Sequence, residues 1–399
     1  MENNKTPKIR FKGFTDPWEQ RKFGDVGSVA MCKRIFKEQT SDEGDVPFYK
    51  IGTFGGEPDA YISQELFDEY KAKYPFPNKG DILISASGSI GRTVEFTGGN
   101  EYFQDSNIVW LKHGKDIDNS FLKILYNVVE WSCEGSTIKR LYNDNFLKTE
   151  FMLPNIDEQK KIGEYFCSLD NLITLHQRKY NKLLNVKKSM LEKMFPKNGS
   201  NIPEIRFKGF TDPWEQRKLK ETIEYIVDNR GKNPDYYCSE GIPVIDNFMI
   251  RNSLYPDLNT ATRFIDENLY QNFIRKYNEE DDILLTLVGN GIGNITLFPK
   301  DKAVIIQNTL GFRAKEDKKF LFFLLMANNE ALVKLDRGMA QPSIRQDEIL
   351  DLDIYVPSNS EQTQIGEYFS NLDNLITLHQ RELEKLQNIK KSMLEKMFV

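Results

Sequence analysis

The chain has 399 residues, of which 28% are charged, 39% hydrophobic and 12% aromatic. This length exceeds what one hydrophobic core usually serves, and the composition excludes a disordered or fibrous protein. The formal net charge is −5, so a DNA-binding role would need Lys and Arg gathered on one face, or positive charge supplied by partner subunits.

Several classes of protein are excluded by what the sequence lacks. No apolar run approaches the ~18 residues of a membrane span, and the first residues, Met1–Lys5, lack the apolar core of a signal peptide, so we expect a cytoplasmic protein without a membrane partner. The four cysteines show no CxxC spacing and there are three histidines, so we expect no disulfide framework, metal site or cofactor.

No motif predicts catalysis. There is no GxxxxGK[ST] loop of a P-loop motor and no cofactor turn of an adenine methyltransferase. The glycines at 289–293 resemble a nucleotide-binding turn only superficially, because neither they nor the counterpart turn at 88–92 open a convincing helix.

A lead-in segment occurs twice. PKIRFKGFTDPWEQRK at Pro7–Lys22 and PEIRFKGFTDPWEQRK at Pro203–Lys218 differ at one position. The FTDPW string predicts a turn, because proline fixes its own backbone and the aspartate can form an Asx-type turn. We interpret its tryptophan, Trp18 or Trp214, as a packing anchor rather than a ligand-stacking ring.

The globular region after each lead-in shares a pattern of elements with the other but little sequence. Two strands, a glycine-rich turn and a helix are predicted at 46–51, 81–84, 88–92 and 120–131, and again at 242–247, 282–285, 289–294 and 318–335. A last strand ends at Pro154 or Pro357, and Asp157 or Ser360 is expected to cap the helix that follows.

The long helix is the second repeat. IGEYFCSLDNLITLHQR at 162–178 and IGEYFSNLDNLITLHQR at 365–381 differ at two positions, and KKSMLEKMF follows each. Apolar residues step by four and three across 162–194, a heptad seam roughly 50 Å long at about 1.5 Å per residue. The residues expected to pair the helices are Ile162, Phe166, Leu169, Ile173 and His176 with Ile365, Phe369, Leu372, Ile376 and His379.

Because one helix cannot bury such a stripe alone, its near-identical twin is the expected partner, paired antiparallel about a pseudo-two-fold axis with His176 near His379. The alternative, two helices in two unrelated cores, fits the strict 3.5-residue period less well. The fold class is thus α+β, with two globular domains separated by two long coiled-coil helices. The expected boundaries are 1–157, 158–197, 198–360 and 361–399.

Duplicated helices that bracket two dissimilar domains resemble the specificity subunit of type I restriction–modification enzymes. The likeness is carried by Pro154, Glu158-Gln159, Ile162-Gly163, Leu169-Asp170 and Ile173, and by Pro357, Glu361-Gln362, Ile365-Gly366, Leu372-Asp373 and Ile376. The Gly-Asp-Ile-Leu pattern at 80–91 also matches the family's target recognition domains, as does 281–293, where Asp281 replaces the first glycine.

The resemblance implies a non-catalytic subunit that reads a split, asymmetric target in double-stranded DNA, one domain per half-site. It further implies that the helices fix the gap between the halves and dock two methyltransferase subunits, which recruit motor–nuclease subunits. Two alternatives remain: a coiled-coil scaffold whose globular ends bind proteins, and an enzyme with an unrecognised site. The scaffold predicts no salt-sensitive DNA affinity, and the enzyme predicts turnover by the isolated chain.

The resemblance supplies no list of DNA contacts, so we selected loop positions whose donors suit base edges or phosphates. They are Lys50, Ser89, Arg92, Lys139, Arg140 and Asn143 in the first domain, and Asn290, Asn294, Gln341, Ser343 and Arg345 in the second. For each residue the alternative is a solvated or turn-forming polar side chain.

Overall fold

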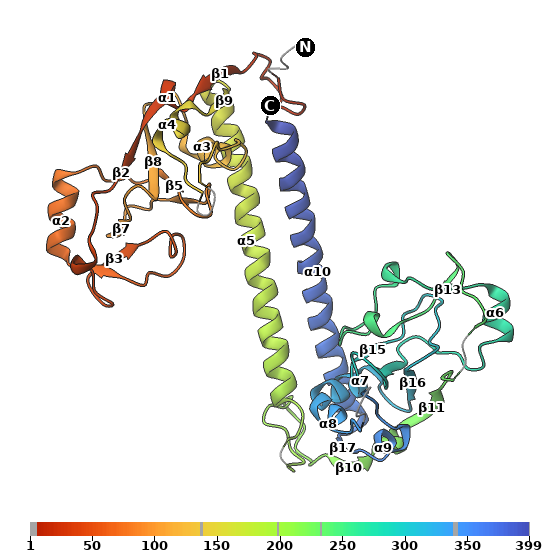
Figure 1. Cartoon of the computed structure of the whole chain (residues 1–399). Coiled ribbons are helices and arrows are strands. Elements are labelled where there is room, and N and C mark those ends of the chain that lie inside the picture. The colour runs from red at the N-terminus through yellow and green to blue at the C-terminus, as the bar shows by residue number, and fades with distance from the viewer. Residues whose placement is uncertain (1–5, 136–138, 198, 232–233, 338–341, 399) are drawn as a thin grey trace. The chain divides into compact units, whose positions relative to one another are not determined.

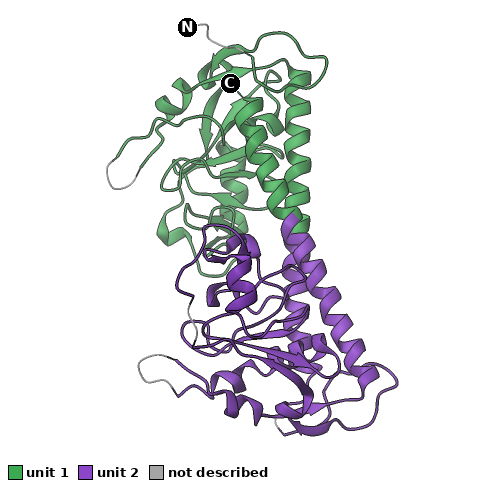
Figure 2. Ribbon diagram, turned by 90° about the vertical axis from the view of Figure 1, so that its right-hand side faces the viewer, with its two compact units in different colours: residues 1–176, 382–399 green, residues 177–381 purple. Residues whose placement is uncertain are grey.

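The computed structural model describes residues 6–135, 139–197, 199–231, 234–337 and 342–398. Its chain divides into two compact units, residues 1–176 with 382–399 and residues 177–381, coloured separately in Figure 2. The division falls inside both long helices, so each unit combines segments that lie about two hundred residues apart in the sequence.

The first unit is built on a four-stranded antiparallel sheet of order β2-β8-β5-β6 (Figure 1). The strands of the first unit are β1 Glu19–Lys22, β2 Gly27–Met31, β3 Val46–Tyr49, β4 Tyr61–Ile62, β5 Ile82–Ser85, β6 Thr93–Glu95, β7 Tyr102–Phe103, β8 Ile108–His113 and β9 Glu150–Leu153. Its helices are α1 Phe23–Val26, α2 Gln64–Lys73, α3 Asn119–Leu125, α4 Asn143–Lys148 and the start of α5 Ile156–Lys193, with a 3-10 turn at Lys37–Gln39. Smaller sheets pair β4-β3-β7 and β1-β9.

The second unit repeats this plan with the sheet β11-β16-β14-β15. Its strands are β10 Glu215–Lys218, β11 Ile223–Val227, β12 Ile242–Pro243, β13 Phe264–Ile265, β14 Ile283–Thr286, β15 Ile295–Leu297, β16 Thr309–Ala314 and β17 Asp353–Val356. Its helices are α6 Glu267–Asn272, α7 Lys318–Ala327, α8 Asn329–Val333, α9 Gln346–Leu350 and the start of α10 Asn359–Met397, with 3-10 turns at Leu219–Thr222, Asn247–Met249 and Leu258–Thr260. The shared strand order confirms the common skeleton expected from the sequence.

Within each unit, the two long helices run antiparallel. In the first unit, the ring centroids of Phe166 and Phe398 lie 6.2 Å apart, and Asp170 contacts Lys390 further along. In the second unit, Phe369 stacks on Phe195 at 5.8 Å, and Asp373 contacts Lys187 further along. In each unit the residue number rises along one helix as it falls along the other, which confirms the α+β fold class with paired antiparallel long helices.

The residues of the predicted seam are buried or half-buried. Ile162, Phe166, Leu169, Ile365, Phe369, Leu372 and Ile376 are buried, and Ile173, His176 and His379 are half-buried. The whole-length pairing of the helices and the approach of His176 to His379 stay predictions.

Each lead-in segment joins the start of one long helix to the end of the other within its unit. Trp18 and Trp214 are both 2% exposed, as expected of packing anchors. Arg10 forms two hydrogen bonds with buried Glu158, at 2.9 and 2.7 Å, and the backbone N–H of Ile9 donates to the Lys396 carbonyl at the end of α10. An orphan carbonyl of the helix end is thereby satisfied by the chain's own beginning.

The corresponding contacts recur in the second unit. Arg206 bonds Glu361 at 2.7 and 2.7 Å, and Ile205 N–H donates to the Lys193 carbonyl. The repeated lead-in is thus explained by one structural task performed twice.

Four local expectations need correction. The helix predicted at 120–131 ends at Leu125, because the side-chain amide of Asn127 donates to the Lys123 carbonyl and competes with helical hydrogen bonding. The helix predicted at 318–335 is instead two helices, α7 and α8, separated at Asn328. Asp157 does not cap α5.

The residue that caps α5 is Asn155, two residues earlier than expected. Asn155 Oδ1 accepts from the Glu158 N–H at 3.0 Å, and Asp157 lies in the first turn of the helix. In α10, the carbonyl of Ser358 accepts from the N–H groups of Glu361 and Gln362, so Ser360 is likewise inside the helix.

Candidate functional site

A glycine-rich turn follows the central strand of each four-stranded sheet. Gly91 N–H donates back to the Ser85 carbonyl at 3.1 Å, and Gly293 N–H to the Thr286 carbonyl at 3.0 Å. Gly91 and Gly293 have φ of 90° and 79°, a region that favours glycine. The turns therefore present Ser89 and Asn290 in the loop beyond the sheet.

A second segment pairs beside each turn. In the first unit, Leu141 N–H donates to the Ala86 carbonyl at 2.8 Å and Gly88 N–H to the Lys139 carbonyl at 3.2 Å. This pairing brings the predicted residues Lys139 and Arg140 next to the loop that carries Ser89. The sequence placed these residues about fifty positions apart.

The second unit makes the same pairing with different residues. Ile344 N–H donates to the Leu287 carbonyl and Gly289 N–H to the Pro342 carbonyl, both at 2.9 Å. Ser343 therefore lies beside the glycine turn that carries Asn290. Gln341, also predicted, lies outside the described residues.

A concavity opens beside each pair of segments. The first has a volume of about 660 Å³ and its lining includes Arg140, Tyr142 and Asn143. The second has a volume of about 670 Å³ and its lining includes Asn290 and Asn294. Arg140 and Asn143 in the first unit, and Asn290 and Asn294 in the second, thus line a concavity beside the glycine turn, which is the arrangement of a binding face on a rigid scaffold.

Two predicted cations of the first unit share one neighbouring loop. Lys50 Nζ lies 2.9 Å from a carboxylate oxygen of Asp59. Arg92 Nη2 donates to the Ile51 carbonyl at 2.7 Å, and its guanidinium lies 5.6 Å from the Phe54 ring centroid. Each side chain is thus held by a contact with the loop that follows β3, and Lys50 remains 41% exposed.

The predicted residues of the second unit divide into two kinds. Asn294 donates to the Ile250 carbonyl at 3.1 Å and accepts from Asn252 at 3.2 Å, so it fastens a neighbouring loop. Arg345 instead points its guanidinium at Asp347, with hydrogen bonds of 3.1 and 2.6 Å. This contact lowers the pKa of Asp347.

Sequence reasoning missed a cluster centred on Arg263. Its guanidinium bonds both carboxylate oxygens of Asp246, which raises the pKa of Arg263, and donates to the Tyr237 hydroxyl at 3.0 Å. Arg263 and Asp246 line the same concavity as Asn290. The sequence alignment of the two regions places Asp246 at the position of Lys50, and this was the one signal that could have drawn attention to Asp246. No motif in the residues around Arg263 indicated a binding role.

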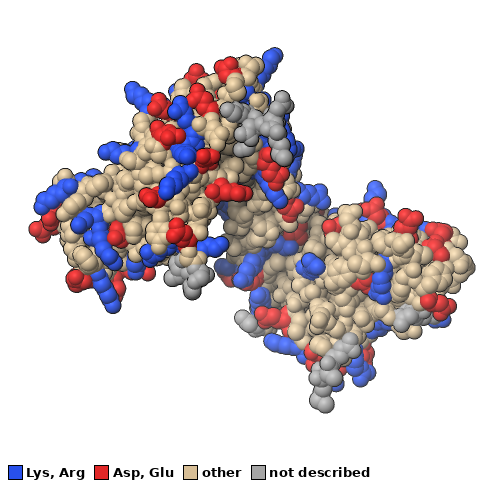
Figure 3. Space-filling model, turned by 45° about the horizontal axis from the view of Figure 1, so that its top comes forward, with Lys and Arg blue, Asp and Glu red and all other residues tan. Residues whose placement is uncertain are grey.

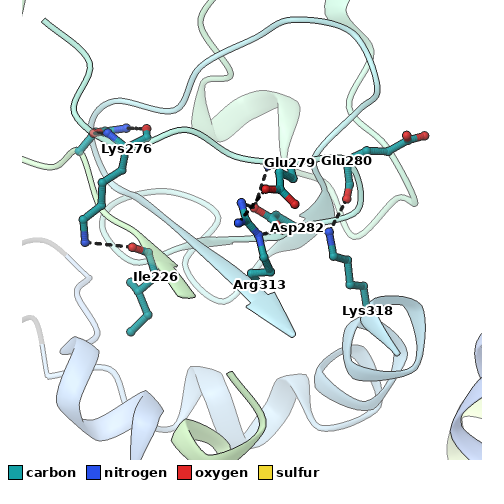
Figure 4. A network of polar contacts seen from close by, with 8 residues as sticks. Ile226, Lys276, Glu279, Glu280, Asp282, Arg313 and Lys318 are labelled. Carbon is teal, nitrogen blue, oxygen red and sulfur yellow. Dashed lines mark hydrogen bonds and ion pairs between the residues drawn. The ribbon is translucent and has the colours of Figure 1, made fainter. Parts of the chain in front are cut away.

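A buried charge network supports the opposite end of the central strand (Figure 4). Asp282 is fully buried and accepts two hydrogen bonds from Arg313, both at 3.1 Å. Lys318 lies 3.3 Å from the same carboxylate, and Asp282 also accepts from the Glu279 N–H. Since the network precedes β14 and the glycine turn follows it, we assign these charges to folding and not to ligand binding.

Charge is not segregated on the visible surface. On the face drawn in Figure 3, Lys and Arg alternate with Asp and Glu over both units. This face thus offers no continuous basic stripe, and phosphate attraction by the chain alone is limited there.

The described residues form neither a metal-binding cluster nor a membrane-spanning helix. Among them, no group of three or more His, Cys, Asp or Glu side chains is placed to hold a metal ion. Within the same ranges, no helix has the length and apolar content to cross a membrane.

Comparisons with known proteins agree on one family. The model of the type I restriction modification DNA specificity domain matches residues 15–185 and 211–388. A putative type I restriction enzyme specificity subunit of Haemophilus influenzae is 58% identical over 156 residues, a match that spans 38% of this chain and only 40% of that relative. A type I restriction enzyme specificity subunit of Methanocaldococcus jannaschii is 28% identical over 79% of this chain and 75% of its own length.

A solved structure shows the same fold over the full length. The S subunit of a type I restriction–modification system from M. genitalium superposes with a TM-score of 0.66 at 16% identity, and 99% of each chain is covered. With two copies of the family domain on duplicated helices, this chain belongs to the type I restriction–modification DNA specificity family, as a specificity subunit rather than a catalytic one.

Proposed function

We propose that this chain reads a bipartite, asymmetric DNA target, with one globular domain for each half-site. The observation that carries the proposal is that the two domains share one frame but differ in chemistry at matching positions. Arg140 and Ser343 make the equivalent bridge beside the glycine turn, to Ser87 and Val288. Different donors on one scaffold are what two different half-sites require.

We further propose that the long helices dock two methyltransferase subunits, which in turn recruit motor–nuclease subunits. Leu172 and Leu175 of α5 are 44% and 45% exposed, and their counterparts Leu375 and Leu378 of α10 are 46% and 52% exposed. The same apolar pair is thus offered once in each unit. Two like patches fit two copies of one partner.

The direct test is to express the chain with its cognate methyltransferase subunit and to map methylated adenines. We expect methylation of one split, asymmetric sequence by the complex and none by the isolated chain. Exchanging residues 23–157 for the corresponding domain of another family member should change one half of that sequence and leave the other half intact. Changes in both halves, or methylation by the chain alone, would contradict the proposal.

Docking is tested by subunit stoichiometry. Leu375→Asp should remove one methyltransferase subunit from the complex and Leu172→Asp the other, because a charge in the apolar patch is costly to bury. The control is Thr174→Asp, at an exposed position of α5. Retention of both subunits in the two leucine variants would rule these patches out.

A further inference from the structure

We propose that Arg345 reads a base edge in the second half-site and that Asp347 is the positioning residue that aims it. The inference rests on the proposed DNA-reading function and names one reader within it. The chemical class recognised is a purine edge with two acceptors in the major groove, the N7 and O6 of guanine, which a guanidinium can bond with two parallel hydrogen bonds.

The hydrogen bonds to Asp347 leave the edge of the Arg345 guanidinium formed by Nη1 and Nη2 available for a guanine base. Arg345 Nε bonds Asp347 Oδ1 at 3.1 Å, and Nη2 bonds Oδ2 at 2.6 Å. A guanidinium has five N–H donors, so Nη1 and the second hydrogen of Nη2 still point outward. Within the described residues, Asp347 is the one hydrogen-bonding partner of this side chain, and the two side chains are 66% and 60% exposed.

Arg345 is placed beside the loop that the proposed function uses. The residue before it, Ile344, is paired with Leu287 at the end of the central sheet. The residue after it, Gln346, accepts a hydrogen bond of 2.6 Å from Arg230. Arg345 therefore belongs to the same end of the sheet as the glycine turn.

Two further arginines around this segment are also held by carboxylates. Arg230 bonds Asp228 at 2.9 and 2.7 Å, and Arg337 lies 2.6 Å from Glu348. A carboxylate reduces attraction to phosphate but fixes the direction of the donors. Such pairs suit base readout, which depends on direction, better than phosphate contact, which depends on charge.

The first unit places different chemistry at the equivalent positions. Glu134 N–H donates to Arg140 as Arg337 N–H donates to Ser343, so Glu134 is the counterpart of Arg337. Its side chain accepts from Asn145 at 2.9 Å, where the second unit has Arg337 with Glu348. Both units therefore have a side-chain contact between these two positions, but it joins Glu134 to Asn145 in the first unit and Arg337 to Glu348 in the second.

The first unit also has a different residue at the position equivalent to Arg345. Its counterpart, one residue after the paired Leu141, is Tyr142, which is 49% exposed. A tyrosine cannot make the forked contact of an arginine. Exchange of surface chemistry on a constant backbone is expected where two domains read different bases.

The experiment uses the complex of the full chain with its methyltransferase subunit. Arg345→Lys keeps the charge but removes the fork, and Asp347→Asn keeps the shape but removes the carboxylate. Methylation rates are measured on the wild-type target and on targets with each single base change. The matched control is Arg217 with Glu215, another exposed pair two residues apart, at 2.7 Å on β10, tested as Arg217→Lys and Glu215→Gln.

We expect both site variants to lose about tenfold or more of the discrimination at one base pair of the second half-site. Discrimination in the first half-site and in both control variants should be unchanged. In Asp347→Asn the slope of binding against salt should also stay the same, because no phosphate contact is removed.

Three results would overturn the assignment. Unchanged discrimination in Arg345→Lys, with a wild-type complex that methylates its site, removes Arg345 as a reader. A loss in Arg345→Lys that is uniform over all targets, with no change in discrimination at any base pair, identifies a phosphate contact instead. A change in Arg345→Lys without one in Asp347→Asn refutes the positioning role. Failure of the wild-type complex to methylate any specific sequence is a different result, and it contradicts the proposed function itself.

Discussion

The ammonium group of Lys187 lies 2.7 Å from a carboxylate oxygen of Asp373, across the paired long helices of the second unit. The first unit repeats the contact with the equivalent residues, Lys390 and Asp170, at 2.6 Å. The repeats differ in burial. The side chains of the first pair are 13% and 9% exposed, and those of the second are 30% and 39% exposed.

This difference predicts unequal costs for the same substitution. Lys187→Met should destabilise the second unit by about 2 kcal/mol or more, because it leaves a buried carboxylate unpaired. Lys390→Met should cost about 0.5 kcal/mol, because water still solvates its partner. Thermal unfolding, with hydrogen exchange to assign the loss to one unit, measures both. Equal losses would contradict the role of burial.

The buried pair also predicts a dependence on pH. Burial raises the pKa of Asp373 above its ordinary value of 3.8, and Lys187 partly opposes the shift. Above the folded pKa the folded state bears the cost of the charge; as pH falls through it, the carboxyl takes up a proton and the cost disappears. The loss caused by Lys187→Met should therefore shrink as pH is lowered from neutral toward that raised pKa. The loss in Lys390→Met is the control, and it should change less.

The glycine of each IGEYF string is required by a close approach. A Cβ at Gly163 would overlap Ser120 and lie 2.9 Å from the Phe121 nitrogen, and one at Gly366 would lie 3.0 Å from the Phe320 nitrogen. Gly163→Ala should cost about 2 kcal/mol, although alanine in an exposed helix is worth about 1 kcal/mol more than glycine. A higher melting temperature for the variant would show that α3 does not press on α5.

The two anchoring tryptophans predict an asymmetric result. Trp18 Nε1 donates to Glu158 at 3.2 Å, whereas Trp214 Nε1 is buried with no hydrogen-bonding partner among the described residues. Both lose the same ring atoms on substitution by phenylalanine. Trp18→Phe should therefore cost about 1 kcal/mol more than Trp214→Phe, and equal costs in denaturant unfolding would refute the contribution of this hydrogen bond.

A chain ended after Lys197 should form a symmetric homodimer. It keeps the first recognition domain but loses α10 and the residue after it, Phe398, which packs on Trp18 and Phe121 in the first unit. The end of α5 in a second copy carries the same residues, including Phe195, and can take that place. We expect mass measurement to give a dimer, and the methylated site to become an inverted repeat of the first half-site.

Two outcomes would contradict that expectation. A monomeric fragment would show that one long helix does not need its twin. A dimer that still methylates the original asymmetric site would show that the second domain is not the reader of the other half.

The sequence by itself determined the repeated frame, because its signals are local. The heptad steps from Ile162, the duplicated Trp18 and Trp214 turns, and the glycine turns after the central strands are each written within a few residues of one another. Periodicity and turn chemistry depend on near neighbours, so they predict helices, strands and loops without a structure. The family resemblance could be recognised from the sequence for the same reason, because its motifs are also made of residues that are close together in the chain.

Only the tertiary structure decided which distant groups meet. It packed Phe398 against Trp18, and Phe195 against Trp214, so that each compact unit is closed by the residues that follow the other half's long helix. It also paired Arg263 with Asp246 and brought Ser343 beside Val288. Such contacts are set by how whole elements pack, and a side chain's partner is therefore not encoded in the residues that surround it in the chain.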